Sequence, residues 1–234
     1  MGELVALKGK VGSPDTRTRV EAFHRVWSIA LASTDSEVKL TALQLLAEPV
    51  GSSSDHIRLP AIYAVADVAN SSDDARVKIA ALETLFEPLN AAQVPVRDVA
   101  IDAVNRIVSS AGPDVTLAAV KALSAPLASG NNGVRVPAIA ALMKAALGSH
   151  NERAYNAALD AIEPALKSAA MVGGMEVRMF AVVAVQRIGV DASETATKAK
   201  AMALLKGTSS GWEPEALRRA DEAMAAIQAS ISKT

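Results

Sequence analysis

The sequence predicts an all-α protein in which short helices stack side by side, an α-solenoid. Three observations lead to this prediction. Half of the 234 residues are hydrophobic although only 3% are aromatic, and Ala supplies about a fifth of the chain. A short phrase recurs at regular spacing from end to end. Within each copy, the apolar residues follow the period of an α-helix.

The composition itself favours helices packed in thin layers. Ala has the highest intrinsic helix propensity, and its small side chain allows close approach between helices. With few aromatic residues, the expected core is aliphatic and shallow, as a layered array requires. The net charge is -1, so bulk charge points to no particular class of partner.

The recurring phrase is a β-branched residue, a basic residue, two further residues, then Ala and an aliphatic residue. Clear copies are Val38–Leu43, Ile57–Ile62, Val77–Leu82, Val96–Ile101, Val134–Ile139 and Val177–Val182. With weaker copies included, the anchoring Ala residues are Ala22, Ala42, Ala61, Ala81, Ala100, Ala119, Ala138, Ala158, Ala181, Ala201 and Ala220. Nine of the ten intervals between them are 19 or 20 residues and one is 23. Such a register indicates an internal repeat.

Each copy predicts one amphipathic helix. Around Ala81 the apolar residues are Val77, Leu82, Leu85 and Leu89, which lie on one helical face. Between these stripes lie clusters of Ser, Asp, Asn and Gly that can cap the next helix. The clusters are 52–55, 71–74, 112–114, 130–133 and 191–194. Eleven helices are therefore expected.

A second pattern doubles the period. Alternate helices end in Glu48-Pro49, Glu87-Pro88, Ala125-Pro126 and Glu163-Pro164. Proline removes a backbone donor and bends or ends the last turn of a helix. The repeating unit is therefore a pair of helices, about 38–39 residues long.

A helix with proline near its end, a tight turn, and a second helix that opens with Val-Arg-x-x-Ala resembles the HEAT-like (armadillo-type) α-solenoid repeat family. The resemblance covers essentially the whole chain and implies a single domain, residues 1–234, wound as a right-handed α–α superhelix. In order along the chain it implies a first helix at about 15–32, four full pairs within 35–189, and two last helices at about 193–231. The pairs occupy about 35–70, 74–109, 113–148 and 152–189. The 23-residue interval lengthens one turn, between Lys167 and Glu176.

A basic residue stands three positions before most anchoring Ala residues. These residues are Arg19, Lys39, Arg58, Lys78, Arg97, Arg135, Arg178 and Lys198. They could form a ridge that binds phosphate or carboxylate groups. Because they occur on both helices of each pair, we favour a structural role, in which they pair with acidic residues of neighbouring turns such as Asp55, Asp73 and Asp74.

The second helix of each pair, which the resemblance places on the concave face, offers the candidate binding residues. Six positions after the anchoring Ala stand Arg106, Lys144 and Arg187, where the first helices carry Glu48 and Glu87, with Glu163 one position earlier in its helix. Two positions after it stand Tyr63 and Val183, which are expected to point away from the core. With the basic residues of the recurring phrase, the predicted partner-binding set is Arg58, Tyr63, Arg97, Arg106, Arg135, Lys144, Arg178, Val183 and Arg187.

Nothing in the sequence indicates an enzyme. His24, His56 and His150 are dispersed over three repeats, and Cys is absent. There is no Gly-rich phosphate loop and no Gly-x-Ser-x-Gly turn. We therefore predict no catalytic residues, no metal and no cofactor. No apolar run reaches the length of a membrane span and no signal peptide is evident, so a soluble, cytoplasmic protein is expected.

The predicted function is a non-catalytic scaffold that binds a protein or peptide on its concave face. The alternatives are a nucleic-acid-binding solenoid similar to HEAT-like DNA-repair glycosylases, and a subunit similar to the HEAT-like bilin lyases. The near-neutral charge and the scarcity of aromatic residues count against nucleic acid. For the lyase, no ligand pocket can be identified from the sequence.

Overall fold

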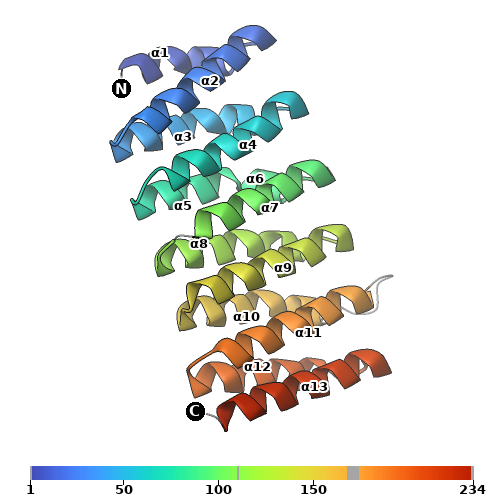
Figure 1. Ribbon diagram of the computed structural model, residues 1–234. Helices are drawn as coiled ribbons and strands as arrows, with labels where there is room; N and C mark the ends of the chain where they lie inside the picture. Colours follow the sequence, from blue (N-terminus) through green and yellow to red (C-terminus); the bar gives the residue numbers. More distant parts are fainter. Residues whose placement is uncertain (1, 110, 168–173, 233–234) are drawn as a thin grey trace. The chain divides into compact units, whose positions relative to one another are not determined.

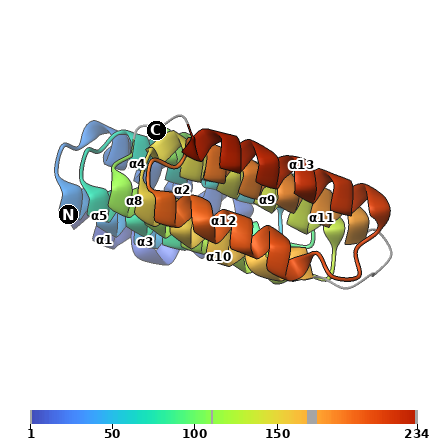
Figure 2. The same ribbon diagram turned by 90° about the horizontal axis from the view of Figure 1, so that it is seen from below.

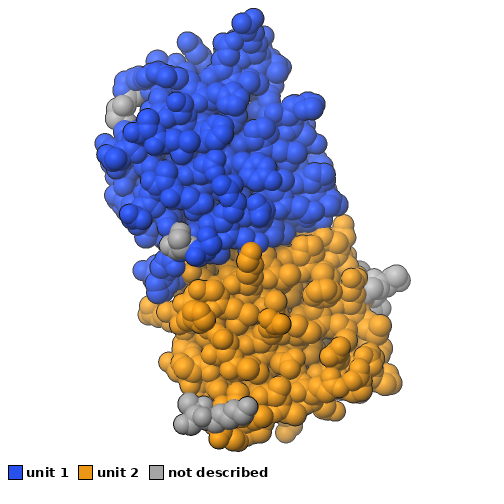
Figure 3. All heavy atoms as spheres, viewed as in Figure 1, with its two compact units in different colours: residues 1–115 blue, residues 116–234 orange. Residues whose placement is uncertain are grey.

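The computed structural model describes residues 2–109, 111–167 and 174–232. In these ranges the chain forms thirteen α-helices and one 3-10 helix, with no β-strand. The predicted all-α class is confirmed. The chain divides into two compact units, residues 1–115 and 116–234 (Figure 3), and each unit is described by itself.

Unit 1 consists of two layers of helices (Figure 1). Its helices are α1 (Gly2–Val11), α2 (Thr16–Ala32), α3 (Ser36–Val50), α4 (Asp55–Asn70), α5 (Ala75–Thr84), α6 (Phe86–Leu89) and α7 (Val94–Val108). In the first layer α1 contacts α3 and α3 contacts α5, while in the second layer α2 contacts α4 and α4 contacts α7. Each helix of the first layer also contacts the helix that follows it in the second, so sequence pairs are spatial pairs.

Unit 2 repeats this arrangement. It contains most of α8 (Pro113–Ser124), then η1 (Ala125–Ala128), α9 (Asn132–Ser149), α10 (Glu152–Lys167), α11 (Gly174–Asp191), α12 (Thr195–Thr208) and α13 (Pro214–Ile231). Here α10 contacts α12 in the first layer, and α11 lies between α9 and α13 in the second. Figure 2 shows α10 and α12 on one side of this unit and α11 and α13 on the other.

The described helices number more than the eleven expected for two reasons. Helix α1 has no copy of the recurring phrase and was not predicted, yet it buries Leu4, Leu7 and Val11 against its neighbours. The single helix expected around Ala81 is divided at Leu85 into α5 and α6. The remaining helices occupy the predicted ranges to within a few residues.

The four prolines near helix ends alter the last turn in different ways. Helix α3 ends one residue after Pro49, and α10 continues three residues beyond Pro164. The break at Leu85 lies three residues before Pro88, and Pro126 lies in the 3-10 turn η1. In each case proline cannot donate to the carbonyl four residues earlier, so the α-helical ladder loses one bond at that point.

Short polar side chains start several helices as expected. The carboxylates of Asp15, Asp35 and Asp74 accept backbone N–H groups in the first turns of α2, α3 and α5, each at 2.8 Å. Asn131 does the same for α9 at 2.9 Å. The residues that precede α4 and α12 make no side-chain cap hydrogen bond.

The anchoring Ala residues lie in the interior of both units. All eleven are buried, and none is more than 3% exposed. Their uniform burial explains the strict register of the sequence, because a larger side chain at these positions would separate neighbouring helices.

Candidate partner-binding surface

The nine residues of the predicted binding set fall into two groups. The side chains of Arg58, Arg97, Arg135 and Arg178 are buried, with 1–6% of each residue exposed. The other five are exposed or half-buried and lie on second-layer helices: Tyr63, Arg106, Lys144, Val183 and Arg187. For the four buried arginines the expectation of a surface position is wrong.

Three of the buried arginines, Arg58, Arg97 and Arg178, reach acidic or carbonyl groups near the start or end of a helix. In unit 1, Arg58 donates to both carboxylate oxygens of Glu87 at 2.8 and 2.6 Å. In unit 2, Arg178 donates to Glu213 at 2.5 Å, and its guanidinium lies 5.9 Å from the ring centre of Trp212. Arg97 donates to the carbonyl of Ala91 at 3.2 Å. Arg58 and Arg178 therefore connect successive helix pairs, and Arg97 holds the turn that precedes its own helix.

Two lysines at the same phrase position cap helix C-termini. Lys39 Nζ donates to the carbonyl and hydroxyl oxygens of Ser71, just beyond α4, at 2.8 and 2.6 Å. Lys198 Nζ makes the same pair of contacts with Ser230 in α13, both at 3.1 Å. A cation is favoured there because the last carbonyls of a helix carry partial negative charge. Burial lowers the pKa of Lys39.

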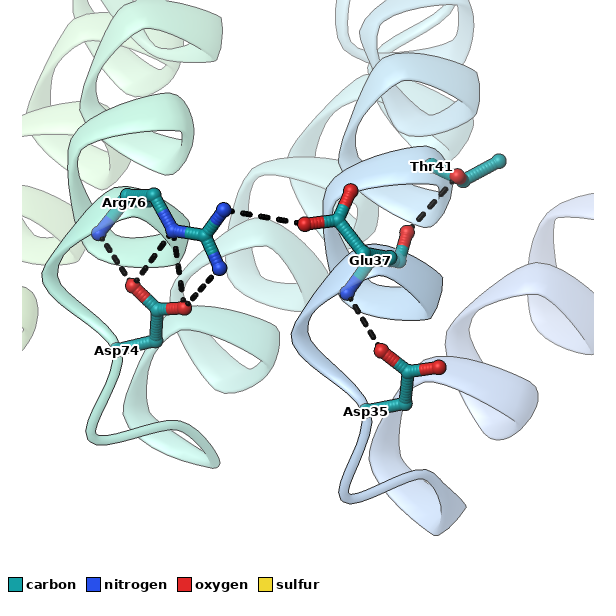
Figure 4. A network of polar contacts seen from close by, with 5 residues as sticks. All are labelled: Asp35, Glu37, Thr41, Asp74 and Arg76. Carbon is teal, nitrogen blue, oxygen red and sulfur yellow. Dashed lines mark hydrogen bonds and ion pairs between the residues drawn. The ribbon is translucent and has the colours of Figure 1, made fainter.

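The structural role predicted for the basic positions therefore matches these contacts, but the partners differ from those expected. Asp74 binds Arg76, two residues after it, with Nη2 to Oδ2 at 2.8 Å. Arg76 also donates to Glu37 of α3 at 3.1 Å (Figure 4). This network joins the N-terminal turns of successive first-layer helices, and the buried cations instead reach helix ends.

In unit 1, the exposed candidates form a small polar cluster across α4 and α7. Arg106 Nη2 donates to Asp67 Oδ1 at 2.6 Å, and its guanidinium lies 5.9 Å from the ring centre of Tyr63. The cation is therefore already paired within the unit. Tyr63 is 40% exposed, so part of its ring remains accessible beside this ion pair.

In unit 2, two of the exposed candidates, Val183 and Arg187, line an open depression of about 540 Å³. Its lining residues come from α9, α11 and α13: Leu147, Val183, Gln186, Arg187, Val190, Asp191 and Arg219. Val183 and Arg187 were predicted and the other five were missed. Leu147 and Val190 each stand nine residues after an anchoring Ala. The candidate residues chosen from the sequence stand two and six residues after it, and extending the same helical face by three residues would have found these two as well.

At one end of the depression the side chain of Asp191 is held by two neighbours. The Tyr155 hydroxyl donates to Asp191 Oδ2, and His150 Nδ1 lies 3.5 Å from the same oxygen. Burial, and then the hydrogen bond to this carboxylate, raise the pKa of Tyr155. His150 has the left-handed backbone conformation that ends α9, with φ of 45°. The phenol therefore remains a hydrogen-bond donor at neutral pH.

Neither a metal site nor a membrane span is found in the residues that the structure describes. No group of three or more His, Cys, Asp or Glu side chains there is placed to hold a metal ion. None of the helices there combines the length and apolarity needed to cross a membrane. The lengthened turn predicted between Lys167 and Glu176 falls mostly on residues 168–173, which lie outside the described ranges.

Comparison with known proteins identifies the class of fold. No family model and no curated protein matches the sequence. Among solved structures, the designed armadillo repeat protein YIII(Dq.V1)4CPAF in complex with peptide (KR)4 has a TM-score of 0.51 at 22% identity, covering 96% of this chain and 99% of that chain. An engineered protein of the Northeast Structural Genomics Consortium has a TM-score of 0.51 at 21% identity, covering 98% and 100%.

A natural protein gives the same result. The archaeal HEAT-like repeats protein from Thermococcus onnurineus NA1 has a TM-score of 0.50 at 15% identity, covering 97% of this chain and 88% of that chain. At these identities the similarity establishes the fold. The predicted α-solenoid of HEAT and armadillo type is confirmed.

Proposed function

We propose that this chain is a non-catalytic scaffold that binds a protein or peptide on the surface of its second-layer helices. The observation that supports this proposal is the depression of unit 2, where the exposed Val183 and Arg187 lie side by side with further apolar residues. Exposed aliphatic side chains beside unpaired charge are typical of interaction surfaces. The Tyr63 ring on α4 offers a second, smaller contact point in unit 1.

The structural neighbours support the proposal at the level of the fold. One of them, the designed armadillo protein, holds the peptide (KR)4. A stack of paired helices is therefore able to present a peptide-binding surface without any catalytic group. For this chain, the residues that would make the contacts are the exposed candidates Tyr63, Arg106, Lys144, Val183 and Arg187.

A random peptide library tests the proposal. The chain would be immobilised, peptides would be selected, and the affinities of the selected peptides measured in solution for the wild type and for Val183→Asp. We expect selected peptides to bind the wild type and to lose at least about tenfold in affinity for Val183→Asp, because the aspartate places a charge among apolar contacts. Val5→Asp, at an exposed valine of the first-layer helix α1, is the matched control.

Two results would overturn the proposal. One is that no peptide is enriched, and the other is that the enriched peptides bind wild type and Val183→Asp equally well. Duplex and single-stranded DNA would be titrated at about 50 mM salt in parallel. Binding of DNA but of no peptide would replace the proposal with the nucleic-acid alternative.

A further inference from the structure

The depression of unit 2 has an apolar wall and a basic rim. Leu147 of α9 and Val183 and Val190 of α11 provide the aliphatic surface, and the last two are 37% and 42% exposed. Arg187 of α11 and Arg219 of α13 provide guanidinium groups at the same depression. A ligand that fills it therefore meets aliphatic side chains and positive charge together.

Among the described residues, Arg187 lacks the acidic partner that several other basic residues of unit 2 have. Within the described ranges it makes no hydrogen bond or ion pair, and neither does Lys144, which holds the equivalent position on the neighbouring helix α9. By contrast, Arg218 binds Glu215 and Glu222, and Lys200 Nζ lies 2.7 Å from Asp160. Arg219 is only loosely held, with Nη1 3.5 Å from Glu222. Of the two guanidinium groups at the depression, that of Arg187 is therefore the one without a partner in the described part of the chain.

The single acidic residue of the lining does not satisfy Arg187. Asp191 Oδ2 already accepts the Tyr155 hydroxyl and faces His150 Nδ1. Its charge is thereby directed toward the α9–α10 turn. A carboxylate from outside would find an arginine whose planar donors are free to bind it in bidentate geometry.

We propose that the depression of unit 2 binds an acidic peptide segment in which a Glu or Asp side chain stands next to an aliphatic one. The carboxylate pairs with Arg187, assisted by Arg219, and the aliphatic side chain packs on Leu147, Val183 and Val190. Lys144, exposed at the equivalent position on α9, adds a further positive charge to the second-layer helices of this unit. The inference rests on the proposed function and specifies the chemistry of the partner.

Two labelled peptides of the same length test this inference by fluorescence anisotropy with the full chain. One repeats Glu-Leu-Ser and the other repeats Lys-Leu-Ser, so they share their aliphatic content and differ in charge. We expect only the Glu peptide to bind, with an affinity that weakens as salt is raised from about 50 to about 200 mM. Arg187→Glu should reduce that affinity about tenfold or more, since it replaces attraction by repulsion.

The matched control is Arg153→Glu, which reverses an exposed arginine on the first-layer helix α10 of the same unit. It should bind the Glu peptide as the wild type does. Circular dichroism and thermal unfolding would establish that both variants fold. Equal loss in the two variants would show a general effect of net charge and would overturn the assignment to Arg187.

The remaining outcomes separate this inference from the proposed function. If neither designed peptide binds but library peptides of other composition bind and are lost with Val183→Asp, the scaffold function stands and the acidic partner is wrong. Preference for the Lys peptide would also overturn the inference of an acidic partner. If sedimentation shows a dimer that Arg187→Glu converts to a monomer, the occupant is a second copy of this chain and the peptide proposal fails.

Discussion

At the scale of single residues, the basic residue three positions before the anchoring Ala can be buried and also bind a group at the end of another helix. A long basic side chain there leaves a buried backbone position and carries its charge to the next helix end. Arg58 reaches Glu87 in this way, and Lys39 reaches Ser71. Burying such a charge is costly unless it is hydrogen-bonded, and these contacts supply the bonds.

The sequence could identify these basic positions but not their burial. The helical phase of Arg97 or Arg135 places it at the edge of the apolar stripe, where a side chain either turns outward or lies along the neighbouring pair. The decision depends on the carboxylate or carbonyl that the next element offers, and this information is not local in sequence. Tyr63 and Val183 lie farther from the stripe, so their exposure was predictable.

A first prediction concerns the charge of Asp74. Hydrogen bonds from the side chain and the backbone of Arg76, then one from Ser36, and last the charge of Arg76 lower its pKa from 3.8 to about 2. Because the folded-state pKa lies below the unfolded one, the charge stabilises the fold above pH 3.8, and this stabilisation is lost as the pH falls toward about 2. Asp74→Asn retains the helix cap but loses the charge. It should therefore be less stable than the wild type at neutral pH, and the gap should close in that acidic range.

Urea denaturation at a series of pH values measures this gap. Asp73→Asn, at the exposed neighbouring residue, controls for the change in net charge and should show a smaller difference from the wild type at neutral pH. A gap for Asp74→Asn that is the same at pH 7 and at about pH 2.5 would contradict the assigned ion pair with Arg76.

At the scale of helices, the sequence predicted the helices that carry the recurring phrase and missed the features that occur only once. The register of Ala residues located α2 to α5, α7 and the later helices, because burial of each Ala recurs in every layer. Helix α1 lacks the phrase, and its Leu4, Leu7 and Val11 are too few to distinguish it from an irregular segment. The division at Leu85 also escaped prediction, since Pro49 and Pro164 are accommodated without such a break.

A second prediction concerns close helix packing at Gly189 in α11. A Cβ atom there would lie 2.8 Å from Ile227 Cδ1 and 3.0 Å from the Ala201 Cβ. Either the buried Ile227 side chain would have to leave its position, or α12 and α13 would have to move away from α11. We expect Gly189→Ala to lower the free energy of unfolding by about 1–3 kcal/mol, as overpacking outweighs the gain in helix propensity.

The matched control is Gly148→Ala in α9, where a Cβ would meet nothing within 4 Å. This substitution should be neutral or stabilising by up to about 1 kcal/mol, because only the propensity term remains. Chemical denaturation of both variants measures these changes in the free energy of unfolding. Equal effects at the two glycines would show that the contacts with Ile227 and Ala201 are not limiting.

At the scale of the whole chain, each layer depends on its neighbours for burial, so stability is expected to vary along the stack. Helix α1 buries three of its ten residues, whereas α4 buries nine of sixteen. An ion pair between Glu3 and Arg25 at 2.5 Å joins α1 to α2, but its side chains are 53% and 55% exposed and such pairs contribute little. Unit 1 should therefore open first at α1.

Amide hydrogen exchange followed by mass spectrometry tests directly whether unit 1 opens first at α1. The amides of α1 should exchange at least about tenfold faster than those of α4, because their opening exposes little apolar surface and leaves α3 and α4 in place. Leu4→Ala should accelerate exchange in α1 and leave α4 unchanged. If α1 and α4 exchange together and respond together to Leu4→Ala, unit 1 opens as one cooperative body, and the burial of the anchoring Ala residues couples its layers more strongly than a nearest-neighbour stack allows.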